Sequence, residues 1–321
     1  MIPAKFHAGR AILVCLLLCT ALQQDGRAVM ITTLDGSGNT DDGGDAVFGE
    51  AFSNVTRYGS GSAIYLRNGW GIRPWHTAPG GGGSVFGQPV ISGAGVRLHE
   101  IGNPSTPVDL VVFQLAADPG LPELTIRTST PPIGEPVRMI GSGANREADQ
   151  TFWRLSGDPQ NPTWTETTNQ GQADRRGYKP LIPPPATTRF GDLRWGTNLI
   201  DSAPQDVTLS DGVLSIVTTD FDRTGRTTHE AQAVGHDSGG AVVIFNSTTG
   251  AWELTGLMHS SGPFVNQPDT PFTAVFGNLS IISDLPSYLP QILPLIPEPS
   301  TSLLLLGGLV LLAGRRHGVA P

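Results

Sequence analysis

Three residues of this sequence stand in contexts that favour chemistry over packing. Ser238 lies in the run GHDSGG, between an acidic residue and two glycines; His76 follows GWGIRPW, and Asp109 precedes the apolar run LVVFQL. A serine hydroxyl is a poor nucleophile at neutral pH unless an imidazole accepts its proton. The imidazole in turn needs an acid that fixes its tautomer. The three residues predict nucleophilic catalysis, with Ser238 as nucleophile, His76 as general base and Asp109 as the orienting acid.

Short strands joined by turns are expected to position these side chains. The 321 residues include 41 glycines and 27 prolines, and only 15% are charged, which favours many strands and few helices. Asn68-Gly69 is a hairpin signal between two strand-like runs, the second of which leads to His76. Further strand signals fall at 90–98, 108–115, 136–140, 207–209, 213–218, 241–245 and 252–258. The chain is therefore expected to be all-β.

The chain order His, Asp, Ser and the surrounding segments resemble the chymotrypsin/trypsin-like serine peptidases. The similar segments are DSGG at 237–240, Trp70 six residues before His76, Asp109 with its apolar strand, GEPVRMIGSG at 134–143 and WELTGL at 252–257. The resemblance implies two antiparallel Greek-key β-barrels in a domain over 29–290. Barrel one would span about 59–125 and barrel two about 126–290. An insertion over 144–195 would form a lid or a binding loop.

The resemblance also implies how the nucleophile is supported. The backbone N–H groups of His236 and Ser238 would form the oxyanion hole, and Asp237 would be a buried structural support for that loop. The family usually has glycine where His236 stands, and a histidine tolerates unusual backbone angles less readily than glycine.

Substrate specificity is expected to depend on three further positions. Gln232 would lie at the floor of the primary specificity pocket, where an amide offers no counter-charge to lysine or arginine. Ser260 and Ser261 would pair with the substrate backbone by strand addition. The reaction needs a protein or peptide substrate but no metal and no cofactor.

Other departures from the family keep a second interpretation open. Arg73-Pro74-Trp75 precedes the histidine where small residues are usual, and His259 stands where the family commonly has a serine near its aspartate. The alternative is a catalytically inactive barrel pair that serves as a surface or biofilm-matrix binding module. An esterase that uses the same triad is a third possibility.

The N-terminus is typical of a secretory signal over 1–28. Lys5 and Arg10 precede an apolar run of 12 residues over 11–22, which is too short for a membrane span of roughly 20 residues. Both cysteines, Cys15 and Cys19, fall in this segment. The mature protein is therefore expected to have no disulfide.

The C-terminal segment 291–321 contains a proline-rich spacer and a second targeting signal. Pro297-Glu298-Pro299 is followed by the apolar run 303–313 and by Arg315-Arg316, which resembles the PEP-CTERM sorting signal of Gram-negative bacteria. The resemblance implies export and a hydrophobic sorting helix that associates transiently with the inner membrane. It also implies recognition by an exosortase and a final location at the cell surface or outside the cell. An ordinary single-span anchor is the alternative.

Charge and the remaining motifs exclude some classes of partner. A net charge of −8 argues against nucleic acid and anionic membrane surfaces. No zinc-type Cys/His cluster or phosphate-binding glycine loop is present in the sequence. The acidic run 35–45 could hold calcium or could be a solvated linker.

Overall fold

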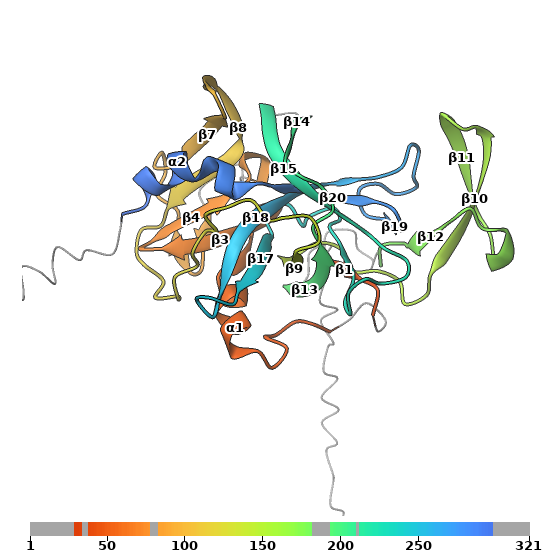
Figure 1. Cartoon of the computed structure of the whole chain (residues 1–321), viewed down its shortest axis with the longest axis horizontal. Helices are drawn as coiled ribbons and strands as arrows, with labels where there is room; N and C mark the ends of the chain where they lie inside the picture. Colours follow the sequence, from red (N-terminus) through yellow and green to blue (C-terminus); the bar gives the residue numbers. More distant parts are fainter. Residues whose placement is uncertain (1–28, 34–37, 78–82, 182–192, 210–211, 298–321) are drawn as a thin grey trace, which may run out of the picture.

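We describe a computed structural model over residues 29–297, except 34–37, 78–82, 182–192 and 210–211 (Figure 1). The expected signal segment 1–28 and nearly all of the PEP-CTERM segment lie outside the described residues. Among the described residues, no helix combines the length and hydrophobicity needed to cross a membrane.

The first half of the domain is a five-stranded antiparallel sheet in the order β2-β3-β4-β8-β7. Its strands are β2 Val55–Tyr58, β3 Gly61–Arg67, β4 Trp70–Arg73, β7 Val96–Glu100 and β8 Asn103–Gln114. The short hairpin of β5 Ser84–Val85 and β6 Gln88–Pro89 lies against β2. Asn68 and Gly69 form the predicted β3–β4 turn with φ of 51° and 77°, the signs that a type I′ hairpin requires.

The second half is a seven-stranded antiparallel sheet in the order β13-β9-β17-β18-β20-β15-β14. Its strands are β9 Pro136–Gly141, β13 Arg194–Leu199, β14 Gln205–Leu209, β15 Gly212–Asp220, β17 Ala241–Asn246, β18 Ala251–Gly262 and β20 Leu279–Ser283. The N–H of Asp201, just beyond β13, donates to the carbonyl of Thr218 in β15 at 2.8 Å. This bond joins the end of the sheet at β13 to β15, the strand next to the opposite end, and closes the sheet into a barrel.

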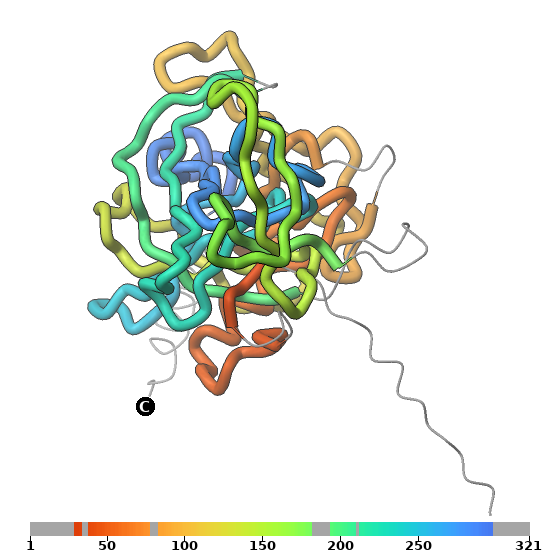
Figure 2. Tube along the Cα trace, turned by 90° about the vertical axis from the view of Figure 1, so that its right-hand side faces the viewer, coloured from red at the N-terminus to blue at the C-terminus, as the bar shows by residue number. Residues whose placement is uncertain are grey.

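The 144–195 insertion is not the loop that its composition indicated. It contains β10 Thr151–Asp158, β11 Asn161–Glu166 and β12 Arg175–Tyr178, which form a four-stranded sheet with β19 Ala274–Val275. The β10–β11 hairpin projects from the body in Figure 1, and Figure 2 views the molecule from this side, with the hairpin in front. A separate two-stranded sheet pairs β1 Met30–Ile31 with β16 Ala231–Gln232.

Helices are few and short. The longest described one, α1 Ala46–Ser53, follows the acidic run 35–45 directly and was not predicted; the Asp45 carboxylate caps it by accepting the Phe48 N–H. Asp41 and Asp42 bind the N–H groups of nearby glycines. The other helical segments are α2 Leu289–Ile292 and the 3₁₀ turns η1 Trp75–Thr77, η2 Gln170–Gln172, η4 Leu285–Tyr288 and η5 Leu293–Leu295.

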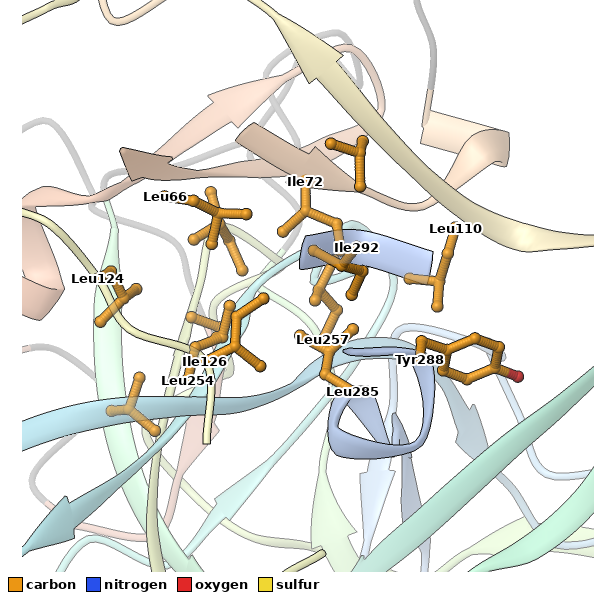
Figure 3. Close-up of a cluster of buried hydrophobic side chains, with 14 of the residues drawn as sticks. Leu66, Ile72, Leu110, Leu124, Ile126, Leu254, Leu257, Leu285, Tyr288 and Ile292 are labelled. Atoms are coloured by element: carbon orange, nitrogen blue, oxygen red, sulfur yellow. The ribbon is translucent and has the colours of Figure 1, made fainter. Parts of the chain in front are cut away.

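The largest buried core lies between the two halves. Figure 3 shows Leu66, Ile72 and Leu110 of the first half facing side chains of the second half. Smaller buried clusters fill each half separately, around Phe113 in the first and Met139 in the second. The expected all-β fold with two antiparallel barrels is confirmed, and its shared core holds the two halves together.

Candidate active site

His76 and Asp109 form a hydrogen-bonded pair in the first half. His76 lies in η1, directly after β4, and Asp109 lies in the neighbouring strand β8. The His76 Nδ1 is 2.6 Å from Asp109 Oδ2, and the His76 backbone N–H donates to Oδ1 at 3.0 Å. The Asp109 side chain is only 5% exposed, whereas that of His76 is 36% exposed. With Nδ1 bonded to the carboxylate, the imidazole presents Nε2 as the proton acceptor, which is the tautomer a general base needs.

Ser238 belongs to a tight turn that touches both halves. Asp237 N–H donates to the Val234 carbonyl at 3.0 Å, and Gly239, with φ of 84°, donates to the Met258 carbonyl at 2.7 Å. The Ser238 carbonyl accepts the Ser62 N–H from β3 at 2.8 Å. A Cβ at Gly61 would lie 2.1 Å from that carbonyl oxygen. Only a glycine lets β3 approach the turn this closely, a constraint the sequence analysis did not identify.

The Ser238 hydroxyl does not bond to His76. Its Oγ donates to the carbonyl of His259 at 3.1 Å, and no hydrogen bond to His76 occurs within the described residues. Hydroxyl torsions change readily, and in ligand-free active sites the bond between nucleophile and base is often long or misaligned. The structure thus joins His76 to Asp109 and leaves Ser238 on a different acceptor.

The two backbone groups predicted for the oxyanion hole differ in their surroundings. Within the described residues, the Ser238 N–H donates to no acceptor. His236 has φ of 78°, in the left-handed region that favours glycine. Its ring lies beside the Ser60 carbonyl, with Nδ1 at 3.1 Å, and packs against Phe272 with ring centroids 5.3 Å apart.

Asp237 is fully buried beneath the turn. Its carboxylate accepts the Gly143 N–H at 2.7 Å and the Val234 N–H at 2.9 Å. Burial raises the pKa of Asp237 to about 7, although these two hydrogen bonds and the charge of Arg194 act in the opposite direction. The carboxylate therefore ties the nucleophile turn to the segment that follows β9.

His259 is the neighbour of Asp109 that sequence reasoning left without a role. Its Nδ1 lies 3.1 Å from Asp109 Oδ2, and its ring is completely buried. The pairing of β18 with β20 shifts register between Met258 and Ser260, and a bulge of this kind re-aims a side chain. Burial alone would raise the pKa of Asp109, but the bonds and charges of His259 and His76 outweigh it and hold that pKa below its ordinary value.

The ligand atoms of His76, Asp109 and His259 lie within 4.8 Å of one another, a spacing that also suits a metal ion. The individual distances favour hydrogen bonds instead. Ligands about 2.0 Å from a tetrahedral zinc ion stand roughly 3.3 Å apart, whereas Nδ1 of His76 and Oδ2 of Asp109 are separated by 2.6 Å. A proton fits between these atoms and a metal ion does not.

The unusual residues before His76 form part of the site wall. The Arg73 guanidinium donates to the Pro74 and Trp75 carbonyls at 2.7 and 3.2 Å and lies over the Tyr58 ring. Trp75 is 44% exposed, and the Arg97 guanidinium stacks on its ring at 4.9 Å. Arg73 thus braces the turn that carries His76, and Trp75 offers an aromatic surface beside it.

The predicted specificity residues lie in two different settings. Gln232 is buried in β16, where its Nε2 donates to the carbonyls of Ala233 and Leu279. Its Oε1 has no partner among the described residues. Ser260 and Ser261 end β18 and pair on one side with β20. Because β17 pairs only as far as Leu257, the opposite edge of Ser260–Gly262 carries no strand in the described part of the chain.

Comparisons with known proteins give distant structural likenesses only. No family model and no curated protein matches the chain. Similar solved structures include the NS6 protease of murine norovirus 1, at 13% identity and a TM-score of 0.37, over 73% of this chain and 90% of that one. An inactive mutant of Rv3671c from M. tuberculosis H37Rv is 11% identical, with a TM-score of 0.41, over 78% of this chain and 91% of that one. Mouse neuropsin, a serine protease, is 11% identical, with a TM-score of 0.41, over 73% of this chain and 87% of that one. Likenesses this distant assign no activity, so the functional argument rests on the geometry of the site.

Proposed function

We propose that this protein is an exported serine endopeptidase that hydrolyses peptide bonds through Ser238, His76 and Asp109. The carrying observation is the His76–Asp109 pair, in which both carboxylate oxygens hold the histidine and its Nε2 remains an acceptor. The unpaired N–H of Ser238 supports the same conclusion, because a tetrahedral intermediate needs such a donor.

The chemistry follows from these groups. The Ser238 hydroxyl leaves the His259 carbonyl and turns to His76, whose Nε2 takes the proton as Oγ attacks the peptide carbonyl. The N–H groups of Ser238 and His236 stabilise the oxyanion, and His76 returns the proton to the leaving amine. Water then hydrolyses the acyl-enzyme with His76 again acting as base. Asp109 stays ionised throughout and stabilises the imidazolium.

Substrate binding would use the free edge of β18. An extended peptide that adds to Ser260–Gly262 would direct the N–H before its scissile carbonyl at the His259 carbonyl. That carbonyl is the acceptor that the Ser238 hydroxyl now occupies. The bound peptide would therefore displace the hydroxyl from this acceptor and leave it available to His76.

A non-catalytic binding module is the second candidate. The observations that favour it are the Ser238 hydroxyl bonded to His259 and the left-handed backbone of His236, where glycine is expected. In this case the free edge of β18 would bind a partner at the cell surface without cleaving it.

Labelling with a fluorophosphonate separates the two candidates. The mature domain is expected to react, and both Ser238→Ala and His76→Ala to lose the label; casein digestion should follow the same pattern. Labelling that persists in Ser238→Ala would rule out the proposed nucleophile. A domain that neither labels nor digests casein would favour the binding module.

The location of the protein is part of the proposal. The N-terminal apolar run and the C-terminal Pro-Glu-Pro segment support export, exosortase recognition and transient association with the inner membrane. Fractionation of cells that express the full chain and a variant truncated after 296 tests this. The full chain should be processed and reach the surface or medium, whereas the truncated variant should bypass exosortase processing.

A further inference from the structure

A cavity of about 390 Å³ lies between the inserted hairpin and the turn that follows β18. Its apolar lining comes from both sides: Leu155 and Trp164 belong to the hairpin, and Phe264 and Val265 belong to the turn. The volume is within the range of about 300–1,000 Å³ that is usual for small-ligand sites. Val265 is 57% exposed, so its side chain is accessible to a ligand that enters the cavity.

Hydrogen bonds hold the two walls of this cavity together. Trp164 Nε1 donates to the Val265 carbonyl at 2.9 Å. Asn266 Nδ2 donates to Asn161 Oδ1 at 2.6 Å and to the Pro162 carbonyl at 3.1 Å. The cavity is therefore a built feature of the insertion and does not depend on a chance approach of two loops.

Ring contacts add to the rigidity of the wall. The Trp164 and Phe264 rings lie 6.2 Å apart, and the Arg175 guanidinium lies 4.7 Å from the centre of the Phe264 ring. The Nε of Arg175 is buried and has no partner among the described residues. The cavity thus combines apolar walls with polar groups, among them the Arg175 Nε and the side chains of Asp158 and Ser156.

The cavity lies in line with the free edge of β18. Gly262 ends the strand, and Phe264 follows two residues later. From His259 to Phe264 is five residues, or about 16 Å at the rise of an extended chain. A peptide that adds antiparallel to this edge, with its scissile bond at Ser238, would reach the cavity with the fourth to sixth residue before that bond.

We propose that this cavity is a remote substrate subsite that takes a large apolar side chain, such as leucine or phenylalanine, from the fourth to sixth residue before the scissile bond. The inference rests on the proposed peptidase function and names part of its substrate. It assigns the insertion a role in selecting substrates, because Leu155 and Trp164 of the hairpin line the cavity.

The test compares Val265→Glu, which places a carboxylate in the cavity, with Ile133→Glu as a matched control. Ile133 is 63% exposed and does not line the cavity, so the control introduces the same charge at another exposed apolar site. A pool of denatured protein digests is treated with each enzyme, and the residues before each cleaved bond are read by mass spectrometry. Two synthetic peptides then carry a preferred cleavage sequence, one with six residues before the bond and one with three.

The wild type should enrich large apolar residues at one position from the fourth to the sixth before the bond. In Val265→Glu the enrichment should disappear. The ratio of kcat/KM between the long and short peptides should fall about tenfold, because burial of such a side chain contributes this much or more. Ile133→Glu should behave like the wild type.

Three outcomes have distinct meanings. Cleavage without any apolar preference at these positions, or equal behaviour of the two variants, overturns the subsite and leaves the peptidase proposal standing. A wild-type protein that neither labels with fluorophosphonate nor cleaves the pool removes the peptidase proposal, and the subsite falls with it. Loss of the preference in Val265→Glu alone supports both.

Discussion

The backbone of His236 stores strain that a pair of substitutions can measure. Its φ of 78° lies in the left-handed region, which costs a residue with a Cβ about 1–2 kcal/mol. The side chain offsets part of this cost, because the ring packs on Phe272 and lies 3.1 Å from the Ser60 carbonyl. A hydrogen bond of this kind contributes roughly 0.5–1.5 kcal/mol. His236→Gly removes the backbone strain and the side-chain contacts together. The free energy of unfolding of this variant alone therefore does not separate the two effects.

Comparison with His236→Ala isolates the backbone effect. Both variants lose the ring and its contacts, but only glycine relieves the positive φ. Glycine also gains more freedom in the unfolded chain, which offsets roughly 0.5–1 kcal/mol. We therefore expect the glycine variant to be more stable than the alanine variant by about 0.5–1 kcal/mol. Urea unfolding followed by tryptophan fluorescence measures this difference, provided that both variants give the same m-value.

An alanine variant as stable as the glycine variant, or more stable, would refute this reasoning. The same pair also tests the oxyanion role, because both substitutions keep the backbone N–H. Peptide cleavage should stay within about tenfold of the wild type in both variants, whereas loss of an oxyanion donor costs about 10²–10³. A hundredfold loss in either variant would mean that the histidine ring itself has a catalytic role.

Three further predictions follow from the same region. Gly61→Ala should lower the free energy of unfolding by about 1–3 kcal/mol and slow fluorophosphonate labelling, because its Cβ would meet the Ser238 carbonyl at 2.1 Å; an unchanged melting temperature and labelling rate would contradict this. The raised pKa of Asp237 means that the unfolded chain loses this proton first, so the contribution of Asp237 to stability should fall as pH rises from about 4 to about 7, by about 4 kcal/mol, and then level off. Asp237→Asn should lack that slope in pH-dependent urea unfolding, and an equal slope in both proteins would count against the assignment. His259→Phe should slow labelling at least about tenfold because it removes the donor to Asp109, whereas His259→Ser, which keeps a hydroxyl, should recover much of the rate; equal rates in the two variants would show that the donor is unimportant.

The fold could be predicted where local sequence decides the backbone. Asn68-Gly69 formed its hairpin because both residues tolerate positive φ. Helix α1 was not predicted because the acidic run 35–45 directly before it favoured a solvated linker. The Asp45 carboxylate nevertheless accepts the N–H three residues later, which is an ordinary N-cap arrangement. The strands of the insertion were not predicted, because its many prolines, threonines and asparagines favoured a loop despite the aromatic residues in β10 and β11.

Predicting the site from sequence had a different limit. Residue types and their order identified the candidates His76, Asp109 and Ser238. They did not identify the hydrogen-bond partners of these three side chains. His259 lies 150 residues from Asp109, and Gly61 lies far from Ser238 in the chain, so neither contact leaves a local pattern. Their positions depend on how β3 meets the Ser238 turn, and how the bulged end of β18 meets β8, when the two halves pack.

In the proposed mechanism, His259 would connect substrate binding with activation of the nucleophile. Its side chain donates to Asp109, and its carbonyl holds the Ser238 hydroxyl. A peptide strand added to β18, as we propose, would compete for that carbonyl and leave the hydroxyl available to His76. Under this proposal, the bond from Ser238 to the His259 carbonyl would keep the nucleophile from its base until a peptide binds, so this bond does not by itself indicate an inactive module.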